Sequence, residues 1–222
     1  RYLLNEKENF FSKFLYPTNT NLVGFQDADG KAYTGDNVNP LNLNGTASNF
    51  QYTKALFDEF GEDDIRRSTT FFVYKIEGGD AAILLTKFMG EMDNNTRRFT
   101  NDWPIYRYAD LQLLLAEIVT MQGGDPATYI NSIRQRAYGD AYVTHKYPQT
   151  GETAEDAILE ERTKEFVGEG KHWYDIRRMK DGDLAKALQI NVTGDLVEKH
   201  LLWPIDATVM SKDPQVEQTP GY

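Results

Sequence analysis

The chain has 222 residues, of which 40% are hydrophobic and 26% charged, as in an ordinary globular protein. Its formal net charge of -10 argues against nucleic-acid binding, because affinity for phosphate comes from clustered Lys and Arg. The chain has no cysteine, which excludes disulfides, thiolate metal sites and a cysteine nucleophile. Its apolar runs are far shorter than the roughly 20 residues that span a bilayer, so no transmembrane helix is expected.

The first 50 residues are rich in Asn, Gly, Asp and Thr and are expected to form irregular loops. Turn signals occur at Asp29-Gly30, Thr34-Gly35 and Asn44-Gly45. Irregular stretches of this length in a compact domain are usually functional or disordered.

Regular structure is expected from Phe50 onward. A short amphipathic helix around Leu56 to Phe60 ends at Gly61. Residues 69–76 are rich in β-formers and predict a strand, and residues 82–87 form a second β-like run. The two runs are expected to pair across the turn at residues 78–80.

The strongest helical pattern follows Trp103-Pro104, with apolar residues at three- and four-residue steps until Gly123-Gly124. Asp125-Pro126 then starts a second helix that ends near Gly139. Helices joined by so short a turn must be antiparallel, and one such hairpin resembles a single tetratricopeptide-type repeat. Residues 142–151 are expected to form a loop.

Two more helices are expected before an irregular tail. Thr153 and Asp156 resemble a capping box for a helix that runs to about Val167. After the break at residues 168–170, Trp173, Ile176 and Met179 predict a short amphipathic helix. Prolines in the tail from residue 201 onward exclude a long helix there.

Six charged and aromatic segments follow one another in the second half of the chain: residues 107–117, 130–137, 161–166, 168–178, 202–205 and 218–222. In this order they resemble the C-terminal half of the SusD/RagB family of outer-membrane nutrient-binding lipoproteins. The chain departs from the family pattern at Asp110, His172, Asp206 and Thr219. These departures affect local contacts and leave the order of the family motifs unchanged.

The resemblance implies a mainly α, SusD-like fold: a tetratricopeptide-type helix hairpin plus further helices, with long irregular loops and a small β-hairpin. Residues 1–222 would be the C-terminal part of such a protein. Residues 1–50 would be a loop-rich, ligand-binding lobe, residues 50–222 a helical scaffold, and a repeat-rich N-terminal half would lie outside the chain. The family captures glycans or peptides at the outer-membrane surface and delivers them to a SusC-like TonB-dependent transporter. A lipid anchor would also lie outside this chain.

Aromatic rings and amides in the loop-rich opening are the candidates for oligosaccharide binding, because rings stack on sugar C–H faces and amides bond to hydroxyls. Packing of these rings on their own scaffold is the alternative. The candidate ligand contacts are Phe25, Tyr33, Asn37, Asn39, Phe50 and Tyr52.

The acidic residues Glu160, Glu161, Glu165 and Glu169 could suggest the carboxylate pair of a glycoside hydrolase. Interleaved Lys and Arg instead favour a solvated, salt-bridged helix face. Five arginines could form an anion site, but we expect them instead to pair with Glu161, Glu165 and Asp175 across packed helices. They are Arg134, Arg136, Arg162, Arg177 and Arg178. The residues assigned a structural role are Arg107, Asn131, Arg134, Arg136, Glu161, Arg162, Glu165, Trp173, Asp175, Arg178 and Pro204.

Metals and cofactors are not expected. The three histidines do not form a zinc motif, and a calcium-like run at Asp27 to Gly30 has its glycine too early. The sequence therefore favours a non-enzymatic binding protein. A carboxylate-based glycosidase and a helical protein-binding adaptor remain the alternatives.

Overall fold

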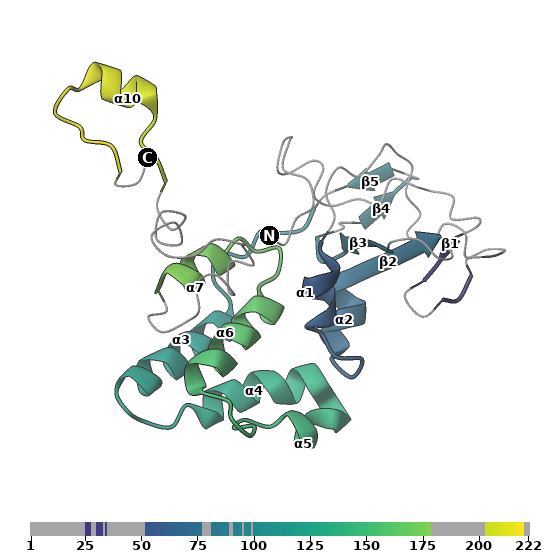
Figure 1. The fold of residues 1–222 in the computed structure, drawn as a ribbon. Coiled ribbons are helices and arrows are strands. Elements are labelled where there is room, and N and C mark those ends of the chain that lie inside the picture. Colours follow the sequence, from purple (N-terminus) through teal and green to yellow (C-terminus); the bar gives the residue numbers. More distant parts are fainter. Residues whose placement is uncertain are drawn as a thin grey trace. The chain divides into compact units, whose positions relative to one another are not determined.

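The computed structural model describes residues 25–27, 30–32, 34, 52–76, 81–88, 91–94, 96–98, 100–178 and 203–219 (Figure 1). The chain divides into a larger unit, residues 2–172, and a smaller unit of residue 1 with residues 173–222. Among the described helices, none is long and apolar enough to cross a membrane.

The first part of the chain contains five strands and two short helices, and the described elements after it are helical. In chain order they are β1 (Phe25–Gln26), α1 (Lys54–Asp58), α2 (Ile65–Thr70), β2 (Phe71–Ile76), β3 (Ala81–Leu85), β4 (Glu91–Asp93), β5 (Thr96–Arg98), α3 (Tyr108–Met121), α4 (Ala127–Tyr138), η2 (Gly139–Ala141), α5 (Tyr142–His145), α6 (Ala154–Glu165), α7 (His172–Arg178) and α10 (Ala207–Lys212).

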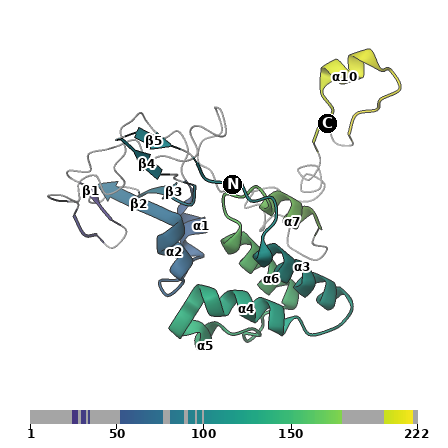
Figure 2. The ribbon, with the colours of Figure 1, turned by 180° about the vertical axis from the view of Figure 1, so that it is seen from behind.

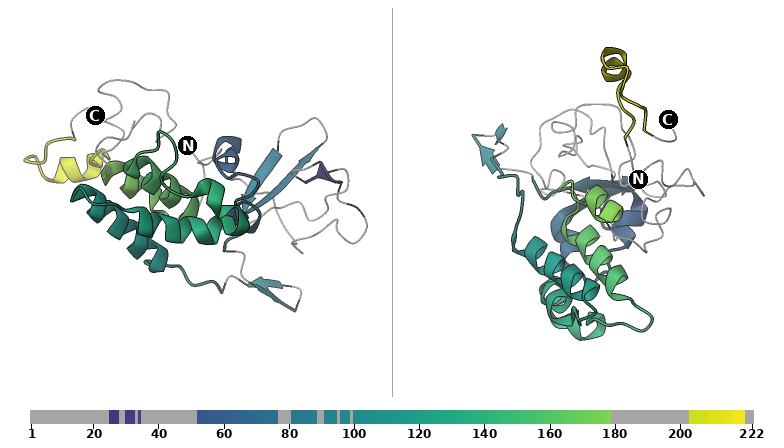
Figure 3. Two further views of the ribbon diagram at one scale, coloured as in Figure 1. Left: turned by 90° about the horizontal axis from the view of Figure 1, so that it is seen from below. Right: turned by 90° about the vertical axis from the view of Figure 1, so that its left-hand side faces the viewer.

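The predicted β-hairpin is confirmed. β2 pairs with β3 in antiparallel register, with Phe71 opposite Leu85, and β1 joins the other edge of β2. Residues 69–70 belong to α2 and not to the strand: Asp64 caps α2 by accepting from the Arg66 amide, and the Thr69 hydroxyl donates to the Ile65 carbonyl at 3.1 Å. A separate hairpin, β4–β5, lies apart from this sheet (Figure 3).

An aromatic core lies between the sheet and α1. The Thr53 side chain caps α1, as its hydroxyl accepts from the Leu56 amide. Phe71 of β2 meets Phe57 and Phe60 edge-on, with ring centroids 5.8 and 5.2 Å apart. These rings are buried, and edge-to-face contacts add to the hydrophobic gain of burial.

The second half of the larger unit is a helical group. α3 and α4 form the expected antiparallel hairpin, and α6 packs beside both (Figure 2). Gly123 lies in the left-handed region, with φ +73°, in the turn after α3, where a side chain would be strained. Ala109 and Leu113 of α3 pack with Ile133 of α4 and Phe166, which follows α6.

The segment between α4 and α6 differs from the predicted loop, because it contains η2 and α5. Asn131 of α4 holds the end of this segment. Its amide donates to the Tyr147 carbonyl at 3.0 Å and accepts from the Tyr147 amide at 2.7 Å. Thr153 then caps α6 as predicted, accepting from the Asp156 amide at 3.1 Å.

The smaller unit contains most of α7 and a tail with one short helix, α10, where only irregular structure was expected. Asp206 caps α10 by accepting from the Thr208 amide at 2.8 Å. The side chain of Gln218 bonds both backbone groups of Ile205, at 2.8 and 3.0 Å. The exposed Pro204 lies next to this clamp, and Trp203 meets Trp173 edge-on at 6.4 Å. The predicted Met179 contribution to α7 lies outside the described residues.

The two faces of α3 make a matched stability test. Leu113 is fully buried, whereas Leu111 is 51% exposed. We expect Leu113→Ala to lower the free energy of unfolding of the chain by about 2–5 kcal/mol, and Leu111→Ala by less than about 1 kcal/mol. Urea denaturation followed by circular dichroism measures both. Equal losses would contradict the assigned orientation of α3.

Candidate functional site

Four of the predicted ligand contacts lie outside the described residues: Tyr33, Asn37, Asn39 and Phe50. The backbone of Phe25 lies in β1, opposite Ile76 of β2. Tyr52 is 5% exposed, and its ring meets the edge of Phe71 at 5.6 Å. Burial also raises the pKa of the Tyr52 hydroxyl. For Tyr52 the geometry therefore supports core packing over sugar stacking, and the other five residues stay predictions.

Three of the four acids in the motif are buried, so the expectation of a solvated face was wrong for them, whereas Glu160 is exposed. Glu161 is 0% exposed, and Glu165 and Glu169 are each 4% exposed. Glu161 and Glu165 are four residues apart and share one face of α6. Their cationic partners come from other elements. We name this set the buried charge cluster after its buried carboxylates, although the side chain of Arg136 is 58% exposed and that of Arg107 is partly exposed. Its members are Asp64, Arg66, Arg107, Arg134, Arg136, Glu161, Glu165 and Glu169.

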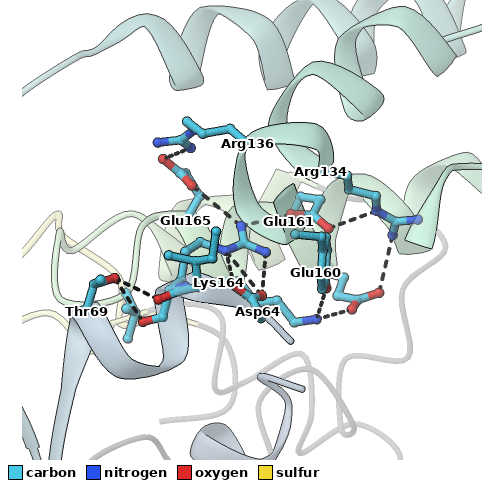
Figure 4. Close-up of polar contacts among 12 residues, drawn as sticks. Asp64, Thr69, Arg134, Arg136, Glu160, Glu161, Lys164 and Glu165 are labelled. Atoms are coloured by element: carbon cyan, nitrogen blue, oxygen red, sulfur yellow. Dashed lines mark hydrogen bonds and ion pairs between the residues drawn. The ribbon is translucent and has the colours of Figure 1, made fainter. Parts of the chain in front are cut away.

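Glu161 lies between two guanidinium groups (Figure 4). Nε of Arg134, from α4, donates to Oε1 at 2.9 Å, and Nη1 of Arg66, from α2, donates to Oε2 at 2.9 Å. Arg66 also binds Asp64 through Nε and Nη2, at 2.8–3.2 Å. Burial alone would lower the pKa of Arg66, but Asp64 and Glu161 outweigh it and raise that pKa.

Arg134 extends the cluster toward the α4–α6 connection. Its Nη1 donates to Glu152 and to the His145 carbonyl, both at 3.1 Å, and its Nη2 also binds Glu152. The planar guanidinium group has several N–H donors that point in different directions, so it can bind several acceptors at once. One side chain of α4 thus fixes α6, α5 and the loop before α6.

Glu165 accepts bonds from three arginines. Arg136 lies 2.6 Å away, Arg66 lies 3.5 Å away, and Arg107, at the start of α3, also binds it. Burial would raise the pKa of this carboxyl, but the bonds and charges of Arg136 and Arg107 outweigh burial and lower it to about 2. Glu165 is therefore ionised at neutral pH.

Glu169 completes the cluster after the glycine break. Arg107 binds both of its oxygens, with Nη2 2.8 Å from Oε1 and Nε 3.1 Å from Oε2. Lys87, which follows β3, binds the same carboxylate and also donates to the Glu165 carbonyl at 2.8 Å. Burial lowers the pKa of Lys87, although Glu169 acts in the opposite direction.

The ring of Phe166 is surrounded by cations. It is 2% exposed, and Lys171, Arg107 and Arg162 lie 4.7, 4.8 and 4.9 Å from its centroid. Cations over an aromatic face are attracted by its quadrupole. Lys171 and Arg162 also approach Asp110 of α3, Arg162 at 3.8 Å. The ring and Asp110 therefore link α3, α6 and the segment after α6.

Two remaining motif pairs are local. Glu160 binds Lys164 at the predicted i,i+4 spacing, and the buried Lys164 also donates to the Tyr138 hydroxyl at 3.2 Å. Asp175 and Arg178 pair at 3.0 Å within α7.

The sequence did not indicate four further residues that bind the charged groups of the motif. They are Asp64, Arg66, Lys87 and Glu152. The run Asp63-Asp64-Ile65-Arg66 carries a helix-cap signal but no signal for its distant partners.

This arrangement is suited to fixing elements rather than to proton transfer. A glycosidase needs a carboxyl whose pKa is raised in an apolar pocket. The pKa of Glu59 is raised, by burial first and then by Glu160, against the effect of Lys164. Lys164, however, binds Glu160 and acts to lower the pKa of Glu59, which opposes the shift that a general acid needs.

Metal binding has no support in the described ranges, where no group of three or more His, Asp or Glu could hold an ion. His145 stacks on Tyr138 at 3.8 Å and lies 2.6 Å from Asp63. Asp27 accepts from the Lys31 amide at 2.8 Å, and Gly30 has φ +84°. Asp29, Asp36 and His200 lie outside the described residues.

Removing the central carboxylate should be costly. We expect Glu161→Gln to lower the free energy of unfolding by about 3–5 kcal/mol, because Arg66 and Arg134 would lose the charge that balances them. Asp58→Asn, in the exposed pair with Lys54, is the control and should cost less than about 1 kcal/mol. Urea denaturation at pH 7 compares the two. Similar small losses would contradict a central role for Glu161.

Acid should weaken the fold partly through Glu165. Its folded-state pKa of about 2 lies below its ordinary value of 4.5, so its stabilisation is present above pH 4.5 and is lost as the pH falls toward 2. A shift of this size corresponds to about 3 kcal/mol. Urea titrations at pH 6 and pH 2 give the fall in the free energy of unfolding between these two values. We expect this fall to be smaller in Glu165→Gln than in the original chain, by about 3 kcal/mol. Parallel pH profiles would disprove this coupling.

The chain is similar to known SusD-like proteins and surface glycan-binding proteins, and three of them are described here. SusD-like protein P2 of Formosa agariphila is 26% identical over 171 residues, which are 72% of this chain and 30% of that protein. A SusD superfamily protein of Bacteroides fragilis is 32% identical, with TM-score 0.74, over 95% of this chain and 48% of that one. Surface glycan-binding protein A of Bacteroides fluxus is 25% identical, with TM-score 0.54, over 81% of this chain and 42% of that one.

This chain thus spans less than half the length of each of these relatives. The family model of the SusD family matches residues 32–222, which include the helical group, the buried charge cluster and the bonds between Gln218 and Ile205 in the tail. With this match and the helix-rich fold that it shares with solved SusD superfamily structures, the chain belongs to the SusD family.

Proposed function

We propose that the full-length protein is a SusD-type binding protein that captures an oligosaccharide at the cell surface. The observation that carries this proposal is the family match over residues 32–222. The likeness to a surface glycan-binding protein supports a glycan as the ligand class. A shallow site of stacked rings and amides would need no acid or base.

The buried charge cluster supports binding over catalysis. Glu161 and Glu165 each contact two or more guanidinium groups, and the pKa of Glu165 is lowered rather than raised. A general acid for glycoside hydrolysis requires the opposite shift. We assign these residues to the scaffold that supports the ligand-binding loops.

The cellular setting follows from the same proposal. The protein would sit at the outer-membrane surface through an N-terminal lipid anchor outside this chain, and would pass its ligand to a SusC-like TonB-dependent transporter for import. Residues 1–222 would be the C-terminal part, with residues 1–50 contributing a ligand-binding lobe. The contact candidates are Phe25, Tyr33, Asn37, Asn39 and Phe50.

Calorimetric titration of the full-length protein with laminari-, malto- and xylo-hexaose tests the proposal. We expect binding of at least one, and Tyr33→Ala or Phe50→Ala should weaken it about tenfold or more, equivalent to about 1.4 kcal/mol. Tyr106→Ala, which removes a ring that is 78% exposed but not a candidate, is the control and should leave affinity unchanged.

Chromatography of the same mixtures distinguishes the alternatives. Release of shorter sugars that stops in Glu59→Gln would support a hydrolase and overturn the binding proposal. Equal affinities of the candidate and control variants would reject the assigned residues. If the full-length protein binds none of the three sugars, these three kinds of glycan are excluded as its ligand.

A further inference from the structure

His145 joins two segments of the larger unit that are far apart in the sequence. It is the last residue of α5, in the connection between α4 and α6, and its Nε2 lies 2.6 Å from Oδ2 of Asp63. Asp63 belongs to the loop between α1 and α2, 82 positions earlier. The pair therefore ties the α1–α2 loop to the helical group.

The imidazole ring of His145 is held in place by its neighbours. It stacks on the ring of Tyr138 with centroids 3.8 Å apart and planes 6° from parallel. Tyr138 is itself buried, and its hydroxyl accepts from Lys164 at 3.2 Å. Arg134 donates to the backbone carbonyl of His145 at 3.1 Å. Since ring and backbone are both positioned, little conformational entropy remains to be lost when the ring binds Asp63.

The charge of this contact depends on pH, unlike that of the links beside it. Arg66 of α2 binds Glu161 and Glu165 of α6, and an arginine in a protein stays protonated. Histidine is the side chain whose charge ordinarily changes between pH 5 and pH 8. The side chains of His145 and Asp63 are 32% and 44% exposed, so solvent protons reach the pair.

The groups around the imidazole define the pH range in which both partners are charged. The hydrogen bond with His145 lowers the pKa of the Asp63 carboxyl below its ordinary value of 3.8. Stabilisation by this carboxylate is therefore present above pH 3.8 and is lost as the pH falls through the lowered pKa. Two cations approach the Tyr138 ring, Lys164 from α6 and Arg66 from α2, with the Arg66 guanidinium 5.8 Å from its centroid.

We propose that Asp63 and His145 form a pH-sensitive latch. At mildly acidic pH the ion pair fastens the α1–α2 loop to α5, and above about pH 7 the loss of the imidazole charge loosens it. The effect is local, because a partly exposed ion pair changes an equilibrium by only a few fold. The buried bonds of Arg66 to Glu161 and Glu165 keep α2 joined to α6 at both pH values.

Hydrogen exchange of the full-length protein at pH 6 and pH 8 tests the latch. Corrected for intrinsic exchange rates, it gives the opening constant of residues 142–147, where the Tyr147 amide donates to Asn131 at 2.7 Å. We expect Asp63→Asn to raise this constant about threefold at pH 6 and less than about 1.5-fold at pH 8. In a His145→Gln background, Asp63→Asn should have no effect at either pH.

A matched control comes from the exposed pair of Lys54 and Asp58 in α1. Asp58→Asn also removes one carboxylate from an ion pair of the same part of the unit. It should leave the opening constant of residues 142–147 unchanged at pH 6 and at pH 8, because this pair lies within one helix.

Three results would overturn the proposal. An equal effect of Asp63→Asn at pH 6 and pH 8 means that the contact acts without a charge on His145. The absence of an effect at both pH values means that the contact does not hold the segment closed. If His145→Gln at pH 6 raises the opening constant of residues 154–165 as much as that of residues 142–147, the loosening is general and not local.

Discussion

The carboxylate of Glu161 is buried between the guanidinium groups of Arg66 and Arg134, and three elements of the larger unit meet there. Moving ions out of water costs several kcal/mol each, and good geometry with further bonds must offset this cost. Here Asp64 and Glu152 bind the remaining nitrogens of the two arginines. Arg66 lies 95 residues before Glu161, so the bridge ties α2 to α6 across most of the unit. A shift of any of these elements would leave a charge without its partner.

The same geometry explains why dense charge here does not imply catalysis. A general acid or base must exchange its proton near the working pH. Glu165 cannot do so, because Arg136 and Arg107 keep it ionised to about pH 2 despite its burial. The ring of Phe166, beneath three cations, fills the space beside these groups. The cluster therefore holds α2, α3, α4 and α6 in fixed positions relative to one another.

Local patterns predicted local structure well. The cap at Thr153, the turn after α3 and the pairing of β2 with β3 each depend on residues close in sequence. The burial of α6 was not predictable in this way. Alternating Glu, Arg and Lys at helical spacing has the same appearance whether the partners are water or distant arginines. Arg66 and Lys87 could not be assigned, since nothing around either residue specifies Glu161 or Glu169. Four of the six candidate ligand contacts lie outside the described residues, and a fifth, Tyr52, is in the core.

Helix α6 buries charged and apolar side chains together. Ala157 and Ile158 are buried, as in an ordinary amphipathic helix, but so are Glu161 and Glu165. These two carboxylates can be buried because α2, α4 and the start of α3 supply opposite charges. A buried ion that loses its partner costs several kcal/mol. The position of α6 therefore depends on the arginines of three other elements as well as on its own apolar contacts.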